Sequence, residues 1–442
     1  MPDREPADLL IEPRWLLPIC PPDTVLEAQA VAIGGGIILA SGPAAQLRQR
    51  FSAREHVVRE RHVLLPGLVN AHTCAAHALL RGRPPGGAPW ARHTASADFV
   101  RDGTRLAIAE MLRAGITCYA DLSPLPAEAA RTAAAAQMRA LIALPVSDAP
   151  TAWAEDASAH LAKAQALWDE YRAHPRVGLY FAPRPPPGLS EATLLRLRRV
   201  ADELDARIAL QLGAAAQCAP ATAPPVGAPR PAGVEDGAAA VGYGPSHALQ
   251  RLQSLGLLRS GFAAVGALGC DAASVALLAR HGATLVGCPQ AELRLGATPA
   301  PLALLGEDRT GLGTDSPVAA GSFDLLAETR AAALLCGLRA TAALRLATLG
   351  GATALGLAAH IGSIEPGKSA DVICLDLGNL AGAHAAAIAD IIVFGATRAQ
   401  VSDAWIAGRT VLAGGRVMIF DEAELAALPG EWARRLALEA AA

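Results

Sequence analysis

The chain contains 442 residues, of which 52% are hydrophobic and 18% are charged, and its formal net charge is −3. This composition excludes a disordered chain. The small negative charge, without a dense run of Lys or Arg, argues against nucleic acid and anionic membranes as partners. No basic segment precedes an apolar stretch at the N-terminus, and no apolar run reaches about 18 residues, so we expect a cytoplasmic protein. The eight cysteines lack C-x-x-C spacing, which excludes a zinc ribbon.

The first elements lie between Leu10 and about Leu65. Short apolar runs alternate there with Pro and Gly, as where Ala30–Ile33 precedes three glycines. This pattern predicts small antiparallel strands joined by turns.

Residues 65–359 alternate short apolar strands with helical segments. Eight such repeats predict an α/β fold with a closed, parallel (β/α)8 TIM-like barrel. The predicted strands are Gly67–Ala71, Thr117–Asp121, Ala140–Val146, Val177–Ala182, Arg207–Leu212, Phe262–Ala267, Ala283–Cys288 and Thr310–Gly313. The clearest predicted helices are Asp98–Arg113, Ala154–Arg172, Ser190–Asp205, Ala272–His281 and Ser322–Leu338.

Residues 213–246 depart from this alternation because they are mostly Ala, Pro and Gly. Such a segment buries too little side chain to offset its ordering entropy, so it predicts a flexible loop. Because it follows a barrel strand, we expect it over the barrel mouth, where barrel active sites lie. A surface insertion without a function is the alternative.

After about His360 the chain returns to strand-like segments, including Ala370–Leu375 and Ala404–Gly408. We expect residues 1–64 and 360–442 to form one composite β-sandwich module beside the barrel at 65–359.

The segment Leu65–Cys74 reads L-P-G-L-V-N-A-H-T-C. It resembles the first barrel strand of the amidohydrolase superfamily, in which the branch of TRZ/ATZ chlorohydrolases and methylthioadenosine/S-adenosylhomocysteine deaminases ends this strand in P-G-L-V-N-x-H-x-H. Ala109–Cys118, Gly313–Ser316 and Ile361–Asp371 resemble the same branch, in the same order. The resemblance implies metal-dependent hydrolysis of C–N bonds in purine-like or triazine-like rings.

Members of this superfamily hold a metal ion with two histidines on strand one, histidines on strands five and six, and an aspartate on strand eight. Residues two apart at a strand end reach the same ion, which lowers the pKa of a bound water to about 7. In this sequence, His72 and Asp315 match the first and last ligands. The other family positions carry different residues. They are Cys74 in place of the second histidine, Gln211 in place of the strand-five histidine, Ala214 in place of the catalytic glutamate, Gly266 in place of the strand-six histidine and Arg184 in place of a substrate-side histidine.

The matched and substituted residues also have purely structural interpretations. His72 and Cys74 are candidate buried core residues, and Arg184 is expected to form an ion pair with Asp315 rather than to hold an anion. His77 is a weaker candidate for a replacement metal-ligating nitrogen, since its place favours the first turn after strand one.

Three hypotheses follow. The leading one is a catalytically impaired pseudoenzyme without a cofactor, which keeps a small-molecule pocket lined by Arg184, Gln211, Ala214 and Gly266. The second is an active hydrolase or deaminase that holds zinc or another divalent metal with His72, Cys74 and Asp315, with Asp315 moving the proton. The third is a structural or regulatory partner of an active paralogue. The resemblance predicts a homodimer or a heteromer with such a paralogue.

Overall fold

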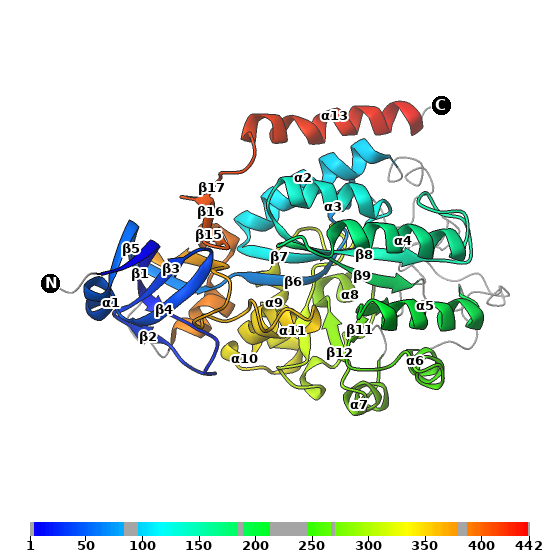
Figure 1. Cartoon of the computed structure of the whole chain (residues 1–442), viewed down its shortest axis with the longest axis horizontal. Coiled ribbons are helices and arrows are strands. Elements are labelled where there is room, and N and C mark those ends of the chain that lie inside the picture. The colour runs from blue at the N-terminus through cyan, green and yellow to red at the C-terminus, as the bar shows by residue number, and fades with distance from the viewer. Residues whose placement is uncertain are drawn as a thin grey trace.

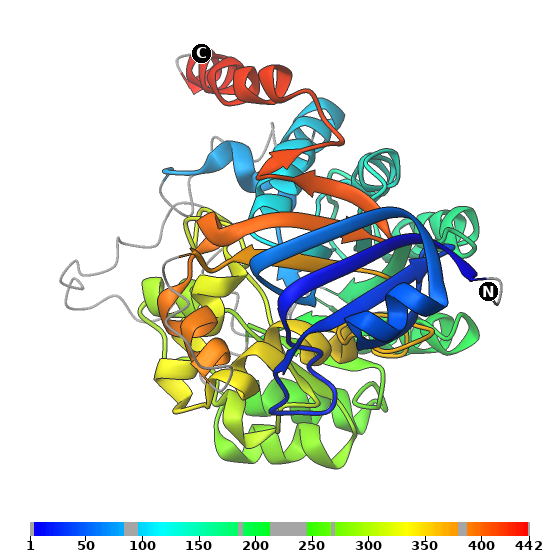
Figure 2. The same ribbon diagram turned by 90° about the vertical axis from the view of Figure 1, so that its left-hand side faces the viewer.

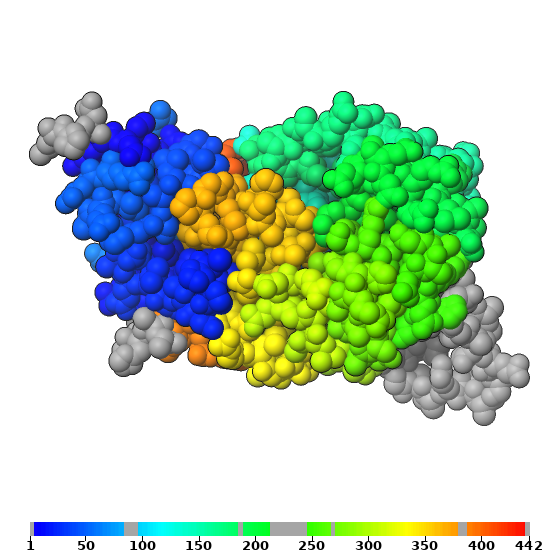
Figure 3. Space-filling model, turned by 60° about the horizontal axis from the view of Figure 1, so that its bottom comes forward, coloured from blue at the N-terminus to red at the C-terminus, as the bar shows by residue number. Residues whose placement is uncertain are grey.

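The computed structural model describes residues 4–83, 96–183, 189–212, 245–266, 270–378 and 387–440. It consists of a barrel surrounded by helices, with a β-module beside it (Figure 1). The module uses strands from both ends of the sequence, and it faces the viewer in Figure 2. In the space-filling view the blue N-terminal strands lie directly against the yellow and orange part of the chain (Figure 3).

The barrel is an eight-stranded parallel sheet in which the strands pair in chain order. All eight predicted strands are confirmed, with ends that differ by two residues or fewer. They are β6 (Leu68–Thr73), β7 (Ile116–Asp121), β8 (Arg139–Val146), β9 (Val177–Pro183), β10 (Ile208–Gln211), β11 (Phe262–Val265), β12 (Thr284–Gly287) and β13 (Thr310–Leu312).

Backbone contacts between the ends of β13 and β6 close the barrel. The His72 carbonyl oxygen accepts hydrogen bonds from the amides of Thr314 and Asp315, both at 3.0 Å, and Thr73 pairs with Asp315 as a parallel bridge. At Gly313 the two chains are so close that a Cβ atom would lie 2.7 Å from the His72 carbonyl oxygen and 2.9 Å from its nitrogen. The closure therefore requires glycine at position 313.

We expect Gly313→Ala to destabilise the protein by about 1–3 kcal/mol, because the added methyl group forces the His72 backbone to move. Urea unfolding measures this effect. Gly42→Ala is the matched control, since a Cβ at Gly42 meets nothing within 4 Å. Equal losses in the two variants would contradict the close approach at Gly313.

Helices cover the outside of the barrel. They are α2 (Ala97–Arg113), α3 (Pro126–Ala135), α4 (Ala157–Tyr171), α5 (Glu191–Glu203), α6 (Pro245–Ser254), α7 (Ala272–Arg280), α8 (Pro289–Arg294), α9 (Leu325–Cys336), α10 (Ala340–Arg345) and α11 (Gly351–Ala354). The five predicted helices are confirmed, but α4 and α9 begin three residues later than predicted. Asp156 and Asp324 cap these helices by accepting backbone amide hydrogens of Ala159 and Ala327, which fixes the first turn.

The β-module is one mixed sheet of nine strands, ordered β17-β16-β15-β14-β5-β1-β3-β4, with β2 paired to β1. The strands are β1 (Glu5–Leu16), β2 (Leu26–Glu27), β3 (Gln29–Gly34), β4 (Ile37–Pro43), β5 (Phe51–Pro66), β14 (Val372–Asp376), β15 (Val401–Ile406), β16 (Arg409–Ala413) and β17 (Arg416–Val417). The short helix α1 (Ala44–Arg50) joins β4 to β5.

The prediction of small antiparallel strands at the N-terminus is wrong for the longest pair. β1 and β5 are 12 and 16 residues long and run parallel, because the β3–β4 hairpin and α1 return the chain to the start of β1. Residue-by-residue periodicity does not reveal which strands pair. A buried cluster that includes Ile11, Leu64 and Trp405 forms the core beneath this sheet.

A buried ion pair joins the barrel to the β-module. Arg139, the first residue of β8, donates to both carboxylate oxygens of Asp371, at 2.6 and 3.0 Å, and to Ser369 Oγ at 2.8 Å. The backbone amide of Ala407 also donates to Asp371, at 2.9 Å. The side chains of Arg139 and Asp371 are 9% and 1% exposed. This largely buried contact therefore connects three segments of the chain.

Helix α13 (Glu422–Ala440), which was not predicted from the sequence, packs on α2 at the top of Figure 1. Trp432 Nε1 donates to the buried Asp102 carboxylate at 3.0 Å, and its ring meets the edge of Phe99 at 5.2 Å. Within the described part of the chain, no helix combines the length and apolar character needed to cross a membrane.

Candidate active site

His72 and Asp315 lie together where β6 and β13 end. His72 Nε2 is 3.9 Å from Asp315 Oδ1, which is too long for a hydrogen bond. Both residues are buried, and His72 Nε2 has no hydrogen-bond partner among the residues that the structure describes. Burial lowers the pKa of His72 and the Asp315 charge opposes this effect, so the imidazole is neutral near pH 7.

The backbone of Asp315 is held in an uncommon conformation. Its φ is 50°, in the left-handed region that costs a non-glycine residue about 1–3 kcal/mol. Its Oδ1 accepts from the Ser316 amide at 2.6 Å, and its carbonyl oxygen accepts from Thr73 Oγ1 at 2.9 Å. The surrounding contacts therefore fix the carboxylate beside His72.

Cys74 and His77 follow β6 at the same end of the barrel. Cys74 precedes the short 3-10 helix η1 (Ala75–Leu80) and is partly exposed rather than a core residue. His77 Nδ1 lies 3.0 Å from Ser316 Oγ, so this imidazole reaches the segment that carries Asp315. Burial lowers the pKa of His77, with opposition from Asp315.

The strand-five and strand-six positions are also neighbours. A Cβ built on Gly266 would lie 3.7 Å from Gln211 Cγ. Gly266 has a φ of 52°, which disfavours a side chain there. Neither residue offers an imidazole or a carboxylate. Arg184, Ala214 and residues 213–244 of the predicted loop lie outside the described residues, whereas Pro245 and Ser246 begin α6 instead of ending that loop.

Three buried acids whose pKa values are raised were not predicted as site residues from the sequence. Asp121 ends β7, and burial raises its pKa to about 7. Glu328 on α9 accepts from the Gln290 amide at 2.9 Å, and burial raises its pKa to about 8. Glu292 on α8 accepts from the amides of Cys288 and Ala300, and burial raises its pKa as well. An acid directly after a buried strand is a usable sequence signal for Asp121, whereas the two helical glutamates resemble ordinary surface residues.

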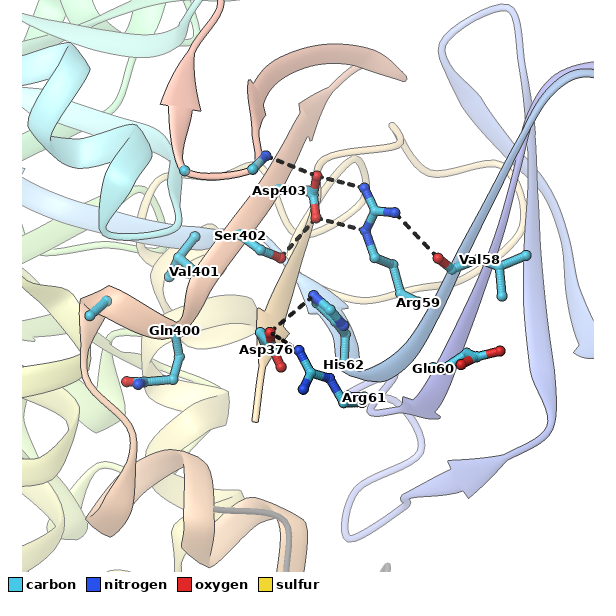
Figure 4. Close-up of a pocket in the computed structure, with 13 residues that line it drawn as sticks. Val58, Arg59, Glu60, Arg61, His62, Asp376, Gln400, Val401, Ser402 and Asp403 are labelled. Carbon is cyan, nitrogen blue, oxygen red and sulfur yellow. Dashed lines mark hydrogen bonds and ion pairs between the residues drawn. The ribbon is translucent and has the colours of Figure 1, made fainter. Parts of the chain in front are cut away.

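A hollow of about 680 Å³ lies in the β-module, away from His72 and Asp315 (Figure 4). Arg59 and Asp403 face each other across it with two bonds of 2.9 Å, and Arg61 donates to Asp376 at 3.1 Å. The charged groups of this hollow therefore largely neutralise one another.

Comparison with known proteins decides the family. The sequence pattern described as "Amidohydrolase family" matches residues 63–411. The chain belongs to the amidohydrolase family. The resemblance seen in the sequence is thereby confirmed, and so are the barrel and the accompanying β-module.

The most informative relatives of this amidohydrolase match it along almost its whole length. A protein of Teredinibacter turnerae named 5-methylthioadenosine/S-adenosylhomocysteine deaminase is 32% identical over 97% of this chain and 98% of its own. A zinc-bound adenosine deaminase from Xanthomonas campestris is 35% identical, covers 99% of this chain and 100% of its own, and superposes with a TM-score of 0.88. The zinc complex of atrazine chlorohydrolase TrzN from Arthrobacter aurescens has a TM-score of 0.80 at 19% identity over 96% of this chain and 99% of its own, and supports the fold alone.

The described residues of this amidohydrolase do not fit a zinc ion. Among them, no three His, Cys, Asp or Glu side chains are grouped so that they could hold a metal. Structural and catalytic zinc sites use at least three protein ligands. Gln211 ends β10 and Gly266 follows β11, at the two places where we expected histidine ligands from the sequence.

Proposed function

We propose that this amidohydrolase is a catalytically impaired, deaminase-like protein that keeps a small-molecule site at the barrel mouth. One observation carries the proposal: the described residues bring His72 and Asp315 together but group no three metal-binding side chains. Disturbing only the groups that orient metal ligands costs about 10–100-fold in affinity or activity, and losing ligands costs more.

The barrel mouth still offers specific contacts to a ligand. His72 Nε2 is buried, it has no hydrogen-bond partner within the described part of the chain, and the Asp315 carboxylate lies beside it. A neutral imidazole beside a carboxylate suits a planar ring that carries N–H donors and ring nitrogens. The names of the relatives suggest that this ring is an adenine-type base.

An active hydrolase is the second candidate, and the relatives favour it. Proteins that match this chain over 97–99% of its length at 32–35% identity are named deaminases. In this case, His72, Cys74 and Asp315 would hold a divalent metal, and Asp315 would move the proton. Cys74 is two residues from His72 in the sequence, and Asp315 Oδ1 lies 3.9 Å from His72 Nε2. The three side chains are not grouped around one point among the described residues, so they would have to move to bind a metal together.

Metal content and turnover distinguish the two candidates. The protein is purified without added metal, its zinc is measured, and ammonia release from adenosine and 5-methylthioadenosine is assayed. The Xanthomonas campestris adenosine deaminase serves as the parallel control. We expect zinc near zero and rates more than about 100-fold below the control. Zinc near one per chain, with turnover that Asp315→Ala abolishes, would establish the active hydrolase instead.

A further inference from the structure

We propose that Asp121 is a positioning residue whose carboxylate fixes the turn Thr73–Ala75, which carries Cys74 and directly follows His72 at the end of β6. The inference goes beyond the proposed function, because it concerns how the mouth is built whether or not the protein turns over a substrate. It assigns a role to a residue on β7, the strand next to β6.

Two hydrogen bonds tie the end of β7 to this turn. Asp121 Oδ1 accepts from the Ala75 amide at 2.8 Å, and the Leu122 amide donates to the Thr73 carbonyl oxygen at 2.8 Å. Cys74 lies between the two tied residues. The Asp121 side chain therefore holds Ala75, which follows Cys74, and the Leu122 backbone amide holds Thr73, which precedes it.

The turn needs a side-chain acceptor because regular strand pairing fails there. The register between β6 and β7 shifts between Asn70 and Thr73, and Cys74 has a φ of −119° and a ψ of 84° as the chain enters η1. Ala75 is completely buried, so water does not replace a missing acceptor. A buried amide without an acceptor destabilises the folded state, and the Asp121 carboxylate supplies that acceptor.

The remaining contacts place Asp121 at the mouth rather than in a remote structural position. Burial raises the pKa of Tyr180 on β9, and the nearby Asp121 and Cys74 contribute to this shift. Asp121 ends β7 at the same end of the barrel as the turn that follows β6. The Asp121 carboxylate holds the turn through Oδ1.

The test compares Asp121→Ala with Asp121→Asn by the rate at which iodoacetamide alkylates Cys74, resolved by peptide mass spectrometry. Both variants remove the charge, but asparagine keeps an oxygen that accepts from Ala75. We expect Cys74 in Asp121→Ala to react about tenfold faster than in Asp121→Asn, which corresponds to about 1.4 kcal/mol of lost restraint. Asp121→Asn should stay within about twofold of the parent protein.

Two controls separate this role from general loosening. Cys336 on α9 is also partly exposed, and its alkylation should not change in either variant. Asp102→Ala removes another buried carboxylate, the acceptor for Trp432, and should leave the Cys74 rate unchanged. Equal Cys74 rates in the alanine and asparagine variants would overturn the proposal.

Hydrogen exchange of the parent protein covers the case in which Asp121→Ala does not fold. The Ala75 amide should exchange as slowly as the amides in the middle of β7. Fast exchange at Ala75 would show that Asp121 does not restrain the turn, and would also overturn the proposal.

Discussion

Replacing Arg139 with methionine should lower the free energy of unfolding by about 3–5 kcal/mol. The substitution leaves the Asp371 carboxylate buried between the barrel and the β-module without its guanidinium partner, and removing one member of a buried ion pair has this typical cost. Ser369 and the Ala407 amide still donate to Asp371, so the carboxylate remains held but uncompensated. Urea unfolding followed by circular dichroism measures the loss.

Arg14→Met is the matched control for this prediction. Arg14 lies 3.5 Å from Glu27, but their side chains are 53% and 41% exposed. Exposed ion pairs contribute about 0–1 kcal/mol, so this variant should remain close to the parent protein. Arg139→Met combined with Asp371→Leu should recover part of the loss, because both charges are then removed. Similar losses for the two single variants would show that the Arg139 contact is not a buried charge pair.

Replacing Glu328 with glutamine should remove a large pH dependence of stability. The pKa of Glu328 is raised from 4.5 to about 8 by burial, so the folded protein holds this proton more tightly than the unfolded chain does. The protonated Glu328 side chain therefore makes its full contribution to the stability of the folded parent protein below about pH 4.5. This contribution is lost as the pH rises to about 8. One pKa unit corresponds to about 1.4 kcal/mol, which gives a total on the order of 3–5 kcal/mol.

The measurement is the free energy of unfolding of Glu328→Gln and the parent protein between pH 5 and pH 9. The two proteins should be similar at pH 5, and the variant should be increasingly more stable toward pH 8. The substituted side chain keeps an oxygen that accepts from the Gln290 amide. Glu203→Gln on the exposed face of α5 is the control and should change stability by less than about 0.5 kcal/mol at each pH. A difference that does not grow with pH would show that Glu328 is ionised in the folded protein.

The barrel could be predicted from sequence because each strand is a short apolar run followed by a helix with its own capping residue. Hydrophobic periodicity reports burial locally, and Asp156 and Asp324 report helix starts locally. The parallel pairing of β1 with β5 was not predictable in this way, because it depends on where a hairpin and a helix return the chain. The packing of α13 on α2 likewise joins residues far apart in the sequence.

The meeting of His72 and Asp315 could also be predicted, since the carboxyl ends of parallel barrel strands share one face. Asp121 follows the same rule and could have been found with it. Glu328 could not, because a glutamate within an amphipathic helix predicts a solvated face. Its burial results from the packing of α8 on α9, which places the Gln290 amide against its carboxylate.

The shared β-module also imposes an order on biosynthesis. β5 emerges from the ribosome with β1, β3 and β4, but β14, its other neighbour, follows roughly 300 residues later. Synthesis proceeds at about 5–20 residues per second, so the edge of β5 that pairs with β14 stays unpaired for roughly 15–60 seconds. A long strand with unpaired backbone groups is a template for pairing between nascent chains. The yield of folded protein should therefore depend on translation rate and chaperone supply.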